Sequence, residues 1–159
     1  MFQPETYTDR QLLQHYADII DELKRRKIVR TENSPPGDYA KWLVTRKLSL
    51  TWSGKPGSGY DATDATESTR YLIKARRVRP TDPSPKFGVI RDLDEQKFDY
   101  LVAVIFNHDF SVQQAVRIPH RVLAEYADYT SRENGHALHM RGPILADTRV
   151  EDLTALLQT

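Results

Sequence analysis

Two short segments near the middle of the chain carry residue types that suit metal-assisted hydrolysis. Asp61 follows a Gly-Tyr pair at the start of GYDATDA, and Lys74 lies inside YLIKA, an otherwise apolar run with the alternation of a β-strand. Lysine is depleted in strands, so Lys74 is a candidate for a specific structural or chemical role. A carboxylate supplies an oxygen ligand for a hard cation, and a partly buried lysine can orient or deprotonate a water molecule.

The two segments predict a β-hairpin that turns at residues 66–69. Antiparallel register then sets Asp61 directly opposite Lys74. Opposite residues project from the same face with Cβ atoms roughly 5 Å apart, so we expect Asp61 and Lys74 to share a face with Leu72 and Arg76. A plain cross-strand ion pair is the alternative interpretation of the same spacing.

Two helices are predicted before the hairpin. Thr8 and Gln11 form a capping box for the first helix. Its apolar residues recur at helical spacing and predict one apolar stripe, made of Leu12, Leu13, Tyr16, Ile19, Ile20 and Leu23. A second helix is expected at about 36–48, with Ser34 as its cap and proline in its first turn. Both helices are expected to cover one face of a sheet.

The segments after the hairpin predict the rest of that sheet. Residues 98–106, FDYLVAVIF, are the most apolar run of the chain and predict a buried strand, with a neighbouring strand at 111–118. The proline-rich residues 80–86 predict a loop. Pro119 is expected to open a helix that runs to about Tyr126, and a final helix is expected near 150–157. This order of elements predicts a mixed α/β sheet flanked by helices in a single domain.

Composition narrows the class of protein. The chain has 159 residues, 39% of them hydrophobic and 28% charged, which is typical of one globular domain. It has no apolar run of membrane-spanning length and no secretory signal at its start, so no membrane association is expected. Cysteine is absent, which excludes disulfides and thiolate metal sites and predicts a reduced, cytoplasmic setting.

The net charge of +1 is not typical of a nucleic-acid-binding protein, but the charge is clustered. Residues 24–30, KRRKIVR, hold five basic side chains and no acid. A second cluster within 74–91 has Asp82 as its single acid and is made of Lys74, Arg76, Arg77, Arg79, Lys86 and Arg91. Each cluster predicts either a phosphate-facing surface or a solvated face, and the first also suits the carboxyl end of a helix dipole.

The arrangement resembles the PD-(D/E)XK, or restriction-endonuclease-like, nuclease superfamily. In this superfamily an aspartate on one strand, a short turn and (Asp/Glu)-x-Lys on the next strand form the catalytic core. GDYAKWLV (37–44) resembles the helix before that hairpin, YLIKARR the lysine strand, and FDYLVAVIFNHDFSVQQAVRIPHRVL (98–123) the strand pair and helix that follow. The resemblance implies a nuclease-like core at 37–125. Residues 1–33 then form an N-terminal helix and basic segment, and 126–159 a tail with a short helix.

The resemblance also implies a chemistry. Asp61 would be the principal ligand of Mg²⁺ or Mn²⁺, the backbone carbonyl of Ile73 a second ligand, and Lys74 the residue that orients or deprotonates the attacking water. The remaining basic residues of the second cluster would hold DNA phosphates: Arg76, Arg77, Arg79, Lys86 and Arg91. Restriction or mobile-element defence is the usual context of such stand-alone domains. Double-strand cutting by so small a unit would favour a homodimer.

The sequence departs from the superfamily pattern at two positions. Leu72 stands where the second acid belongs, and Lys41 stands where the preceding helix usually carries glutamate. Asp38 could substitute for the missing acid, as could Asp64 or Glu67 in another hairpin register.

Three functions therefore remain open: an Mg²⁺-dependent DNA endonuclease, a catalytically inactive DNA-binding or complex-assembly subunit of the same fold, and an interaction protein in which Asp61 and Lys74 are structural.

Other candidate sites are weaker. His136 and His139 have no evident third metal ligand, and GKPGSG lacks the ending of a nucleotide-binding phosphate loop. Trp42 and Trp52 are expected to be core residues.

Overall fold

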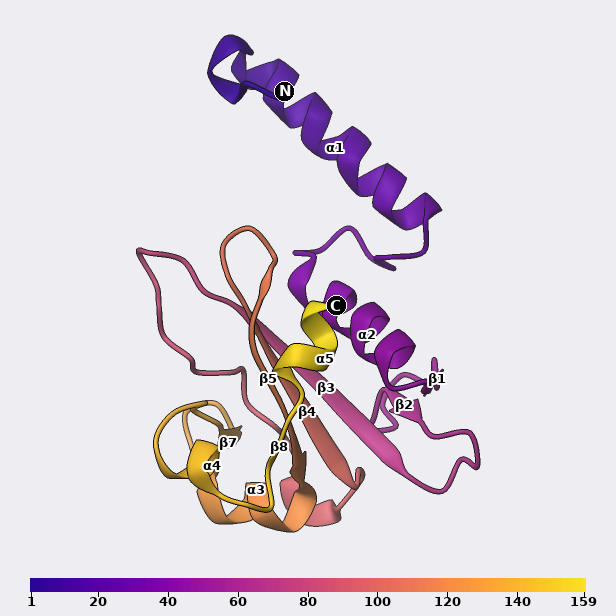
Figure 1. The fold of residues 1–159 in the computed structure, drawn as a ribbon, viewed down its shortest axis with the longest axis vertical. Coiled ribbons are helices and arrows are strands. Elements are labelled where there is room, and N and C mark those ends of the chain that lie inside the picture. Colours follow the sequence, from indigo (N-terminus) through magenta and orange to yellow (C-terminus); the bar gives the residue numbers. More distant parts are fainter.

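A six-stranded mixed sheet forms the centre of the molecule in the computed structural model, which describes all residues 1–159 (Figure 1). The strand order is β1-β2-β3-β4-β5-β8, with β3 and β4 parallel and all other neighbours antiparallel. The strands are β1 (Thr51–Trp52), β2 (Ala62–Thr63), β3 (Arg70–Arg77), β4 (Tyr100–Phe106), β5 (Val112–Pro119) and β8 (Glu151–Asp152). The predicted mixed α/β sheet in a single domain is confirmed.

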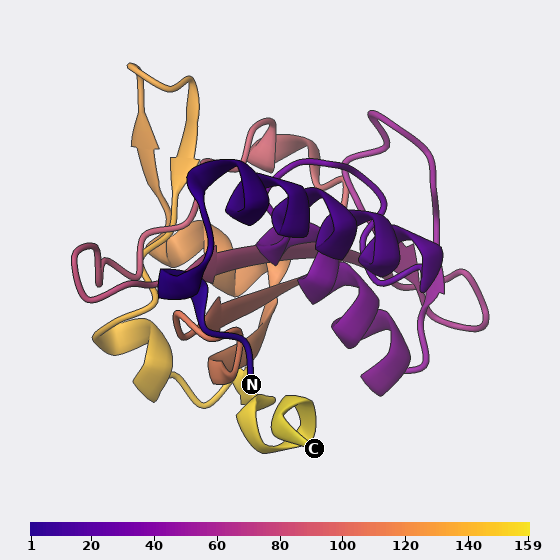
Figure 2. The same cartoon turned by 90° about the horizontal axis from the view of Figure 1, so that it is seen from above.

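Five α-helices and one separate hairpin complete the fold. The helices are α1 (Asp9–Arg25), α2 (Pro36–Lys47), α3 (His120–Tyr126), α4 (Pro143–Ala146) and α5 (Thr154–Gln158), with short 3₁₀ turns at Pro4–Thr6 and Leu93–Glu95. Strands β6 (Asp128–Thr130) and β7 (Gly135–Ala137) form a hairpin that projects from the body (Figure 2). None of the helices combines the length and the apolar character that crossing a bilayer requires.

Strand β4 lies at the centre of the core because both of its faces are covered. Every residue of the strand after Tyr100 is buried. Leu101, Ala103 and Ile105 face one apolar cluster, which α3 and α4 help to form. Val102, Val104 and Phe106 face a second cluster, which α2 and α5 cover. An uninterrupted apolar run is what a strand buried on both faces requires.

Two helix boundaries differ from the predictions. The N-cap of α2 is Pro35 and no side chain caps the helix, so the predicted role of Ser34 is wrong. The final helix begins at Thr154 rather than near 150, because Glu151 and Asp152 pair with Arg117 and Val116 of β5. Pairing there satisfies the backbone groups of an otherwise open sheet edge.

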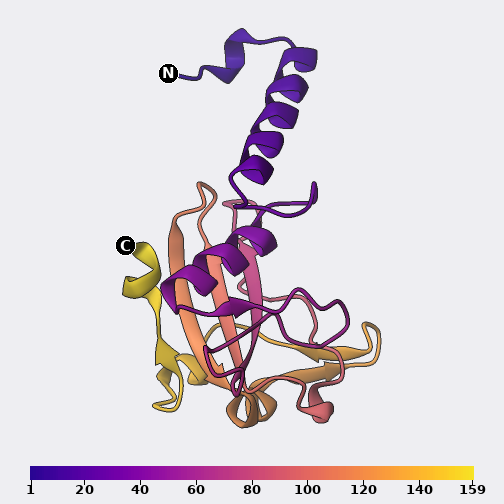
Figure 3. The same cartoon turned by 90° about the vertical axis from the view of Figure 1, so that its right-hand side faces the viewer.

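Helix α1 has the predicted capping box, since the Gln11 N–H donates to the Thr8 hydroxyl and the Thr8 N–H donates to the Gln11 side chain. Its apolar stripe does not cover the sheet, however. Only Ile20 is buried, and Leu13 is 70% exposed. Figures 1 and 3 show α1 extending beyond the end of the sheet, while α2 packs against it. The prediction that both helices cover one face is therefore correct for α2 and wrong for α1.

We expect Leu101→Ala to lower the free energy of unfolding by about 2–5 kcal/mol, because Leu101 is fully buried in the core. Leu13→Ala is the matched control, with an expected change below about 0.5 kcal/mol since its side chain is mostly in water. Urea unfolding measures both values. Equal losses for the two variants would contradict the described packing of α1.

Candidate functional site

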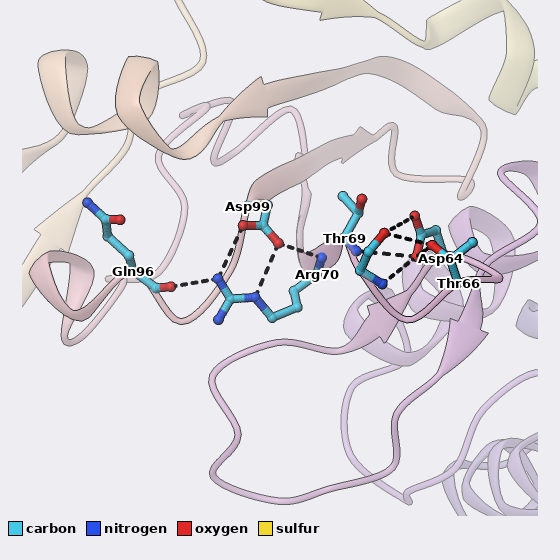
Figure 4. Close-up of polar contacts among 7 residues, drawn as sticks. Asp64, Thr66, Thr69, Arg70, Gln96 and Asp99 are labelled. Carbon is cyan, nitrogen blue, oxygen red and sulfur yellow. Dashed lines mark hydrogen bonds and ion pairs between the residues drawn. The ribbon is translucent and has the colours of Figure 1, made fainter.

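The turn between β2 and β3 is built around the Asp64 carboxylate (Figure 4). Asp64 accepts hydrogen bonds from the backbone N–H groups of Ser68 (2.9 Å) and Thr69 (3.2 Å) and from the Thr66 hydroxyl (3.1 Å). Asp64 and the left-handed Glu67 therefore belong to the turn, which makes them unsuitable as metal ligands. Directly after the turn, at the start of β3, Arg70 donates hydrogen bonds from both its backbone N–H and its guanidinium to the Asp99 carboxylate.

This turn sets a register that differs by two residues from the predicted one. Ala62 pairs with Tyr71 and Thr63 with Arg70, so the predicted opposition of Asp61 and Lys74 is wrong. The ladder becomes irregular beyond Ala62, where the Asp61 N–H donates to the Tyr71 carbonyl (2.8 Å). A slip of two residues preserves the face on which a side chain lies, whereas a slip of one would reverse it.

Both carboxylate oxygens of Asp61 are engaged. Oδ2 accepts from the Ile73 backbone N–H at 2.8 Å, and Oδ1 lies 3.0 Å from the Lys41 ammonium. The Asp61 side chain is 13% exposed, so this contact is largely shielded from water. Lys41 comes from α2, so the ion pair connects the helix to the hairpin. No ion pair joins Asp61 to Lys74.

Lys74 lies half-buried on β3, two residues beyond Leu72 on the same face. Burial lowers the pKa of its ammonium, because the charged form loses hydration. The negative charge of Asp61 raises that pKa, while the positive charges of Lys41 and Arg91 lower it further. Asp61 and Lys74 therefore interact through charge without direct contact.

Two adjoining cavities surround these residues. The first, which we call the Trp52 cavity, has a volume of about 400 Å³, and its charged and aromatic lining consists of Arg30, Lys41, Trp52, Lys55, Tyr60 and Asp61. The second, the Lys74 cavity, has a volume of about 230 Å³ and is lined by Lys74, Arg91, Asp92, Lys97 and Phe98. Gly57, Gly59 and Leu72 line both. Since Leu72 and Lys74 share a face of β3, Asp61 and Lys74 lie on the same side of the sheet.

The loop between β1 and β2 forms the wall between the cavities and requires glycine. Gly59 has φ +84°, and a Cβ atom there would lie 2.5 Å from the Lys97 side chain. Gly54 has φ +63°, and a Cβ atom there would lie 3.3 Å from the Trp52 indole nitrogen. Both values of φ are unfavourable for residues with side chains. The loop backbone can thus approach Trp52 and Lys97 closely.

The residues present do not fit the Mg²⁺ or Mn²⁺ ion that the sequence resemblance implies. The Ile73 carbonyl does face the Asp61 side, because the N–H and C=O of one strand residue point the same way. However, Leu72 offers no ligand, and the Lys41 ammonium lies 3.0 Å from the Asp61 carboxylate, where a metal ion would have to bind. No group of three or more His, Asp or Glu side chains is arranged to hold a metal ion.

Asp38 does not supply the missing acidic ligand at the candidate metal site. Its Oδ2 accepts from the backbone N–H groups of Arg30 (2.9 Å) and Thr31 (2.8 Å) and from the Thr31 hydroxyl (3.0 Å). Burial raises the pKa of Asp38, but these hydrogen bonds outweigh that effect and lower it overall. Asp38 thus holds the segment that carries Arg30, and it lines neither cavity.

The predicted phosphate-binding residues do not form one surface. Arg76 pairs with Asp82 at 2.5 Å, and Lys86 pairs with Glu133 at 3.4 Å. Arg77 donates to the His108 carbonyl and covers the Phe110 ring, on the opposite face of β3 from Arg76.

The other two predicted residues are exposed. Arg79 lies in the loop after β3, where its backbone forms an isolated antiparallel β-bridge with the backbone of Asp82. Of the five, only Arg91 lines the Lys74 cavity, and none lines the Trp52 cavity.

Several residues of the cavities were missed by the sequence interpretation. Trp52 was expected in the core, but it lies half-buried on the edge strand β1 and forms a cavity wall. The Arg30 guanidinium carbon lies 3.7 Å from the centroid of its ring, and the Lys41 ammonium lies 5.3 Å away. The available signals were the basic run 24–30 and the lysine within WSGKPGSG.

Comparison with models of known protein families and with curated protein sequences gave no match for this chain.

We predict opposite shifts in the Lys74 pKa from two substitutions. Asp61→Asn should lower it, because a neighbouring negative charge is removed, and Lys41→Met should raise it, because a positive charge is removed. A pH titration followed by NMR of labelled lysine side chains measures both. The pKa of Lys97, which pairs with Asp92 and Glu95, should stay unchanged as the internal control. Shifts of the same sign would contradict the charge arrangement.

Asp64 should make stability depend on acid pH. Burial raises its pKa, but the hydrogen bonds from Thr69, Ser68 and Thr66 together lower it from 3.8 to about 2. A lowered carboxyl pKa stabilises the fold fully above about 3.8, and this contribution disappears as the pH falls to about 2. Asp64→Ala should therefore be less stable than the wild type at pH 5 in urea unfolding.

The difference in stability between Asp64→Ala and the wild type should shrink toward pH 2. The exposed Asp94 makes no side-chain hydrogen bond, so Asp94→Ala is the control and should be about as stable as the wild type at pH 5. A difference for Asp64→Ala that stays constant with pH would contradict the role of the carboxylate.

Proposed function

We propose that this protein binds the phosphate backbone of nucleic acid through the Trp52 and Lys74 cavities, on a nuclease-like fold that does not depend on a metal ion. The observation that carries the proposal is the Lys41 ammonium 3.0 Å from Asp61. At the position where a nuclease of the resembled superfamily has an acid, this chain supplies a positive charge. The site therefore attracts anions instead of divalent cations.

The charge of the cavity walls supports this proposal. Arg30, Lys41 and Lys55 line the first cavity against the single acid Asp61. Lys74, Arg91 and Lys97 line the second against Asp92, which pairs with Lys97. Concave surfaces lined by one sign of charge concentrate ligands of the opposite sign. We propose that the two adjoining cationic cavities hold neighbouring phosphate groups of one nucleic-acid chain.

The order of elements also accords with the nuclease-like fold. Helix α2 precedes the β2–β3 hairpin, and β4, β5 and α3 follow it, which is the order in which the resembling motifs occur along the sequence. Fold alone does not determine activity, so the site residues decide between binding and hydrolysis.

Mg²⁺-dependent hydrolysis of DNA is the second candidate function. The position of Asp61, the Ile73 carbonyl and Lys74 on one side of the sheet favours it. The engagement of both Asp61 oxygens and the apolar Leu72 disfavour it.

We expect binding to a fluorescent oligonucleotide to weaken with salt and to persist in EDTA. Lys55→Gln and Arg91→Gln should each weaken binding and reduce the slope of log K against log salt by about 0.7–0.9, the value for one lost phosphate contact. Arg10→Gln on α1 is the matched control, since Arg10 is exposed and lies outside both cavities. Fluorescence anisotropy over a salt series measures the slopes.

Three outcomes would count against the proposal. The first is no binding by the wild type at low salt, and the second is an equal effect of Arg10→Gln. The third is cleavage of plasmid DNA with Mg²⁺ or Mn²⁺ that is lost in both Asp61→Ala and Lys74→Ala, which would establish the second candidate function instead.

A further inference from the structure

We infer that the Trp52 cavity receives an unpaired nucleotide, so that the protein selects single-stranded nucleic acid over duplex. This inference rests on the proposed nucleic-acid binding and specifies the class of ligand. It begins from an aromatic ring and a guanidinium that lie together in a cationic cavity, where neither is needed for the hydrophobic core.

In the wall of the Trp52 cavity, two cationic side chains lie over the Trp52 ring. The guanidinium carbon of Arg30 lies 3.7 Å from the centroid of the Trp52 ring, which is stacking distance, and the Lys41 ammonium lies 5.3 Å from the same centroid. Trp52 belongs to neither of the two buried clusters. A large aromatic ring outside the core and beside two cations is available to a ligand.

Hydrogen bonds to Asp38 fix the segment that carries Arg30 in the free protein. Asp38 accepts the backbone N–H groups of Arg30 and Thr31, which connects this segment to the first turn of α2. On the other side, Trp52 pairs with Ala62 in the sheet, and the Ser53 N–H donates to the Asp61 carbonyl at 2.9 Å. The guanidinium and the indole are therefore positioned by separate elements, so little order needs to be created on binding.

This combination of groups matches the chemistry of an unpaired nucleotide. Bases that are free of a duplex stack on aromatic side chains and on arginine planes. Lysines near the stacked base can neutralise its phosphate, and Lys41 and Lys55 line the same cavity. A duplex presents its phosphates outward while its bases are stacked inside, so it could contact the lysines but not the Trp52–Arg30 stack.

The size of the cavity supports the same conclusion. Its volume of about 400 Å³ falls in the range of small-molecule sites, which enclose ligands of about nucleotide size. The glycine-containing loop brings backbone, rather than side chains, against the indole at Gly54. Backbone at this position leaves the cavity open to a flat base.

The test compares Trp52→Leu with Trp42→Leu. Trp42 is a matched control because it is also half-buried and also lies beneath an arginine, with Arg46 5.1 Å from its ring, but it lines neither cavity. Binding of a single-stranded DNA, a single-stranded RNA and a DNA duplex of one sequence is measured by anisotropy at one salt concentration. Thermal unfolding verifies that each variant is folded.

We expect the wild type to bind at least one of the single strands more tightly than the duplex. Trp52→Leu should weaken that binding by about 5- to 150-fold, the usual cost of losing one stacked base, and should weaken duplex binding by a much smaller factor. Trp52→Phe should lie between the wild type and Trp52→Leu because it keeps a smaller ring. Trp42→Leu should bind like the wild type.

A second measurement follows Trp52 directly. In a Trp42→Phe background, Trp52 is the remaining tryptophan, and its fluorescence should be quenched in a saturable way by the preferred single strand.

Equal affinity for single strand and duplex, or equal effects of the Trp52 and Trp42 variants, would overturn the inference while nucleic-acid binding stands. Failure of the wild type to bind any of the three probes would overturn the proposed function itself.

Discussion

The Asp61 carboxylate joins the hairpin to the helix that covers it, and the geometry of the site depends on this contact. One oxygen accepts the Ile73 N–H at the point where the β2–β3 ladder becomes irregular, and the other contacts the Lys41 ammonium of α2. Removal of the carboxylate would leave a partly buried ammonium and a backbone N–H without their partner, which is costly in a site shielded from water. The same contact positions Lys41 beside Trp52 and orients the wall of the cavity.

An ammonium next to this carboxylate has different chemical consequences from a divalent cation. A metal ion needs several oxygen ligands and offers a coordination position at which water becomes a nucleophile. A lysine ammonium carries a single charge on a flexible stem and donates hydrogen bonds, so it attracts phosphate oxygens but offers no coordination position for water. Leu72 of β3 lines the same cavity and offers no oxygen ligand for a metal ion. Lys41 and Leu72, the two departures from the pattern that the sequence resembles, therefore both favour the proposed binding over metal-dependent hydrolysis.

Local sequence patterns were sufficient for most of the elements. The capping box at Thr8, the helix at 36–47, the buried run of β4 and the helix after Pro119 all rely on neighbouring residues, so they can be recognised without knowledge of the fold. The pairing of Glu151 and Asp152 with β5 could not be recognised in this way, because a sheet edge some 35 residues away supplies their partners. The exposed stripe of α1 was misassigned since periodicity shows that a face is apolar but not what covers it.

The sequence by itself thus determined a mixed α/β domain in which an aspartate and a strand lysine come near each other. Only the tertiary structure decided which groups each of them contacts. Hydrogen bonding by Asp64 set the turn and moved the register by two residues, and packing of α2 brought Lys41 to Asp61. The Arg30–Trp52 stack likewise joins residues that are distant along the chain. Such contacts depend on how separate elements pack, and no spacing within one segment encodes that information.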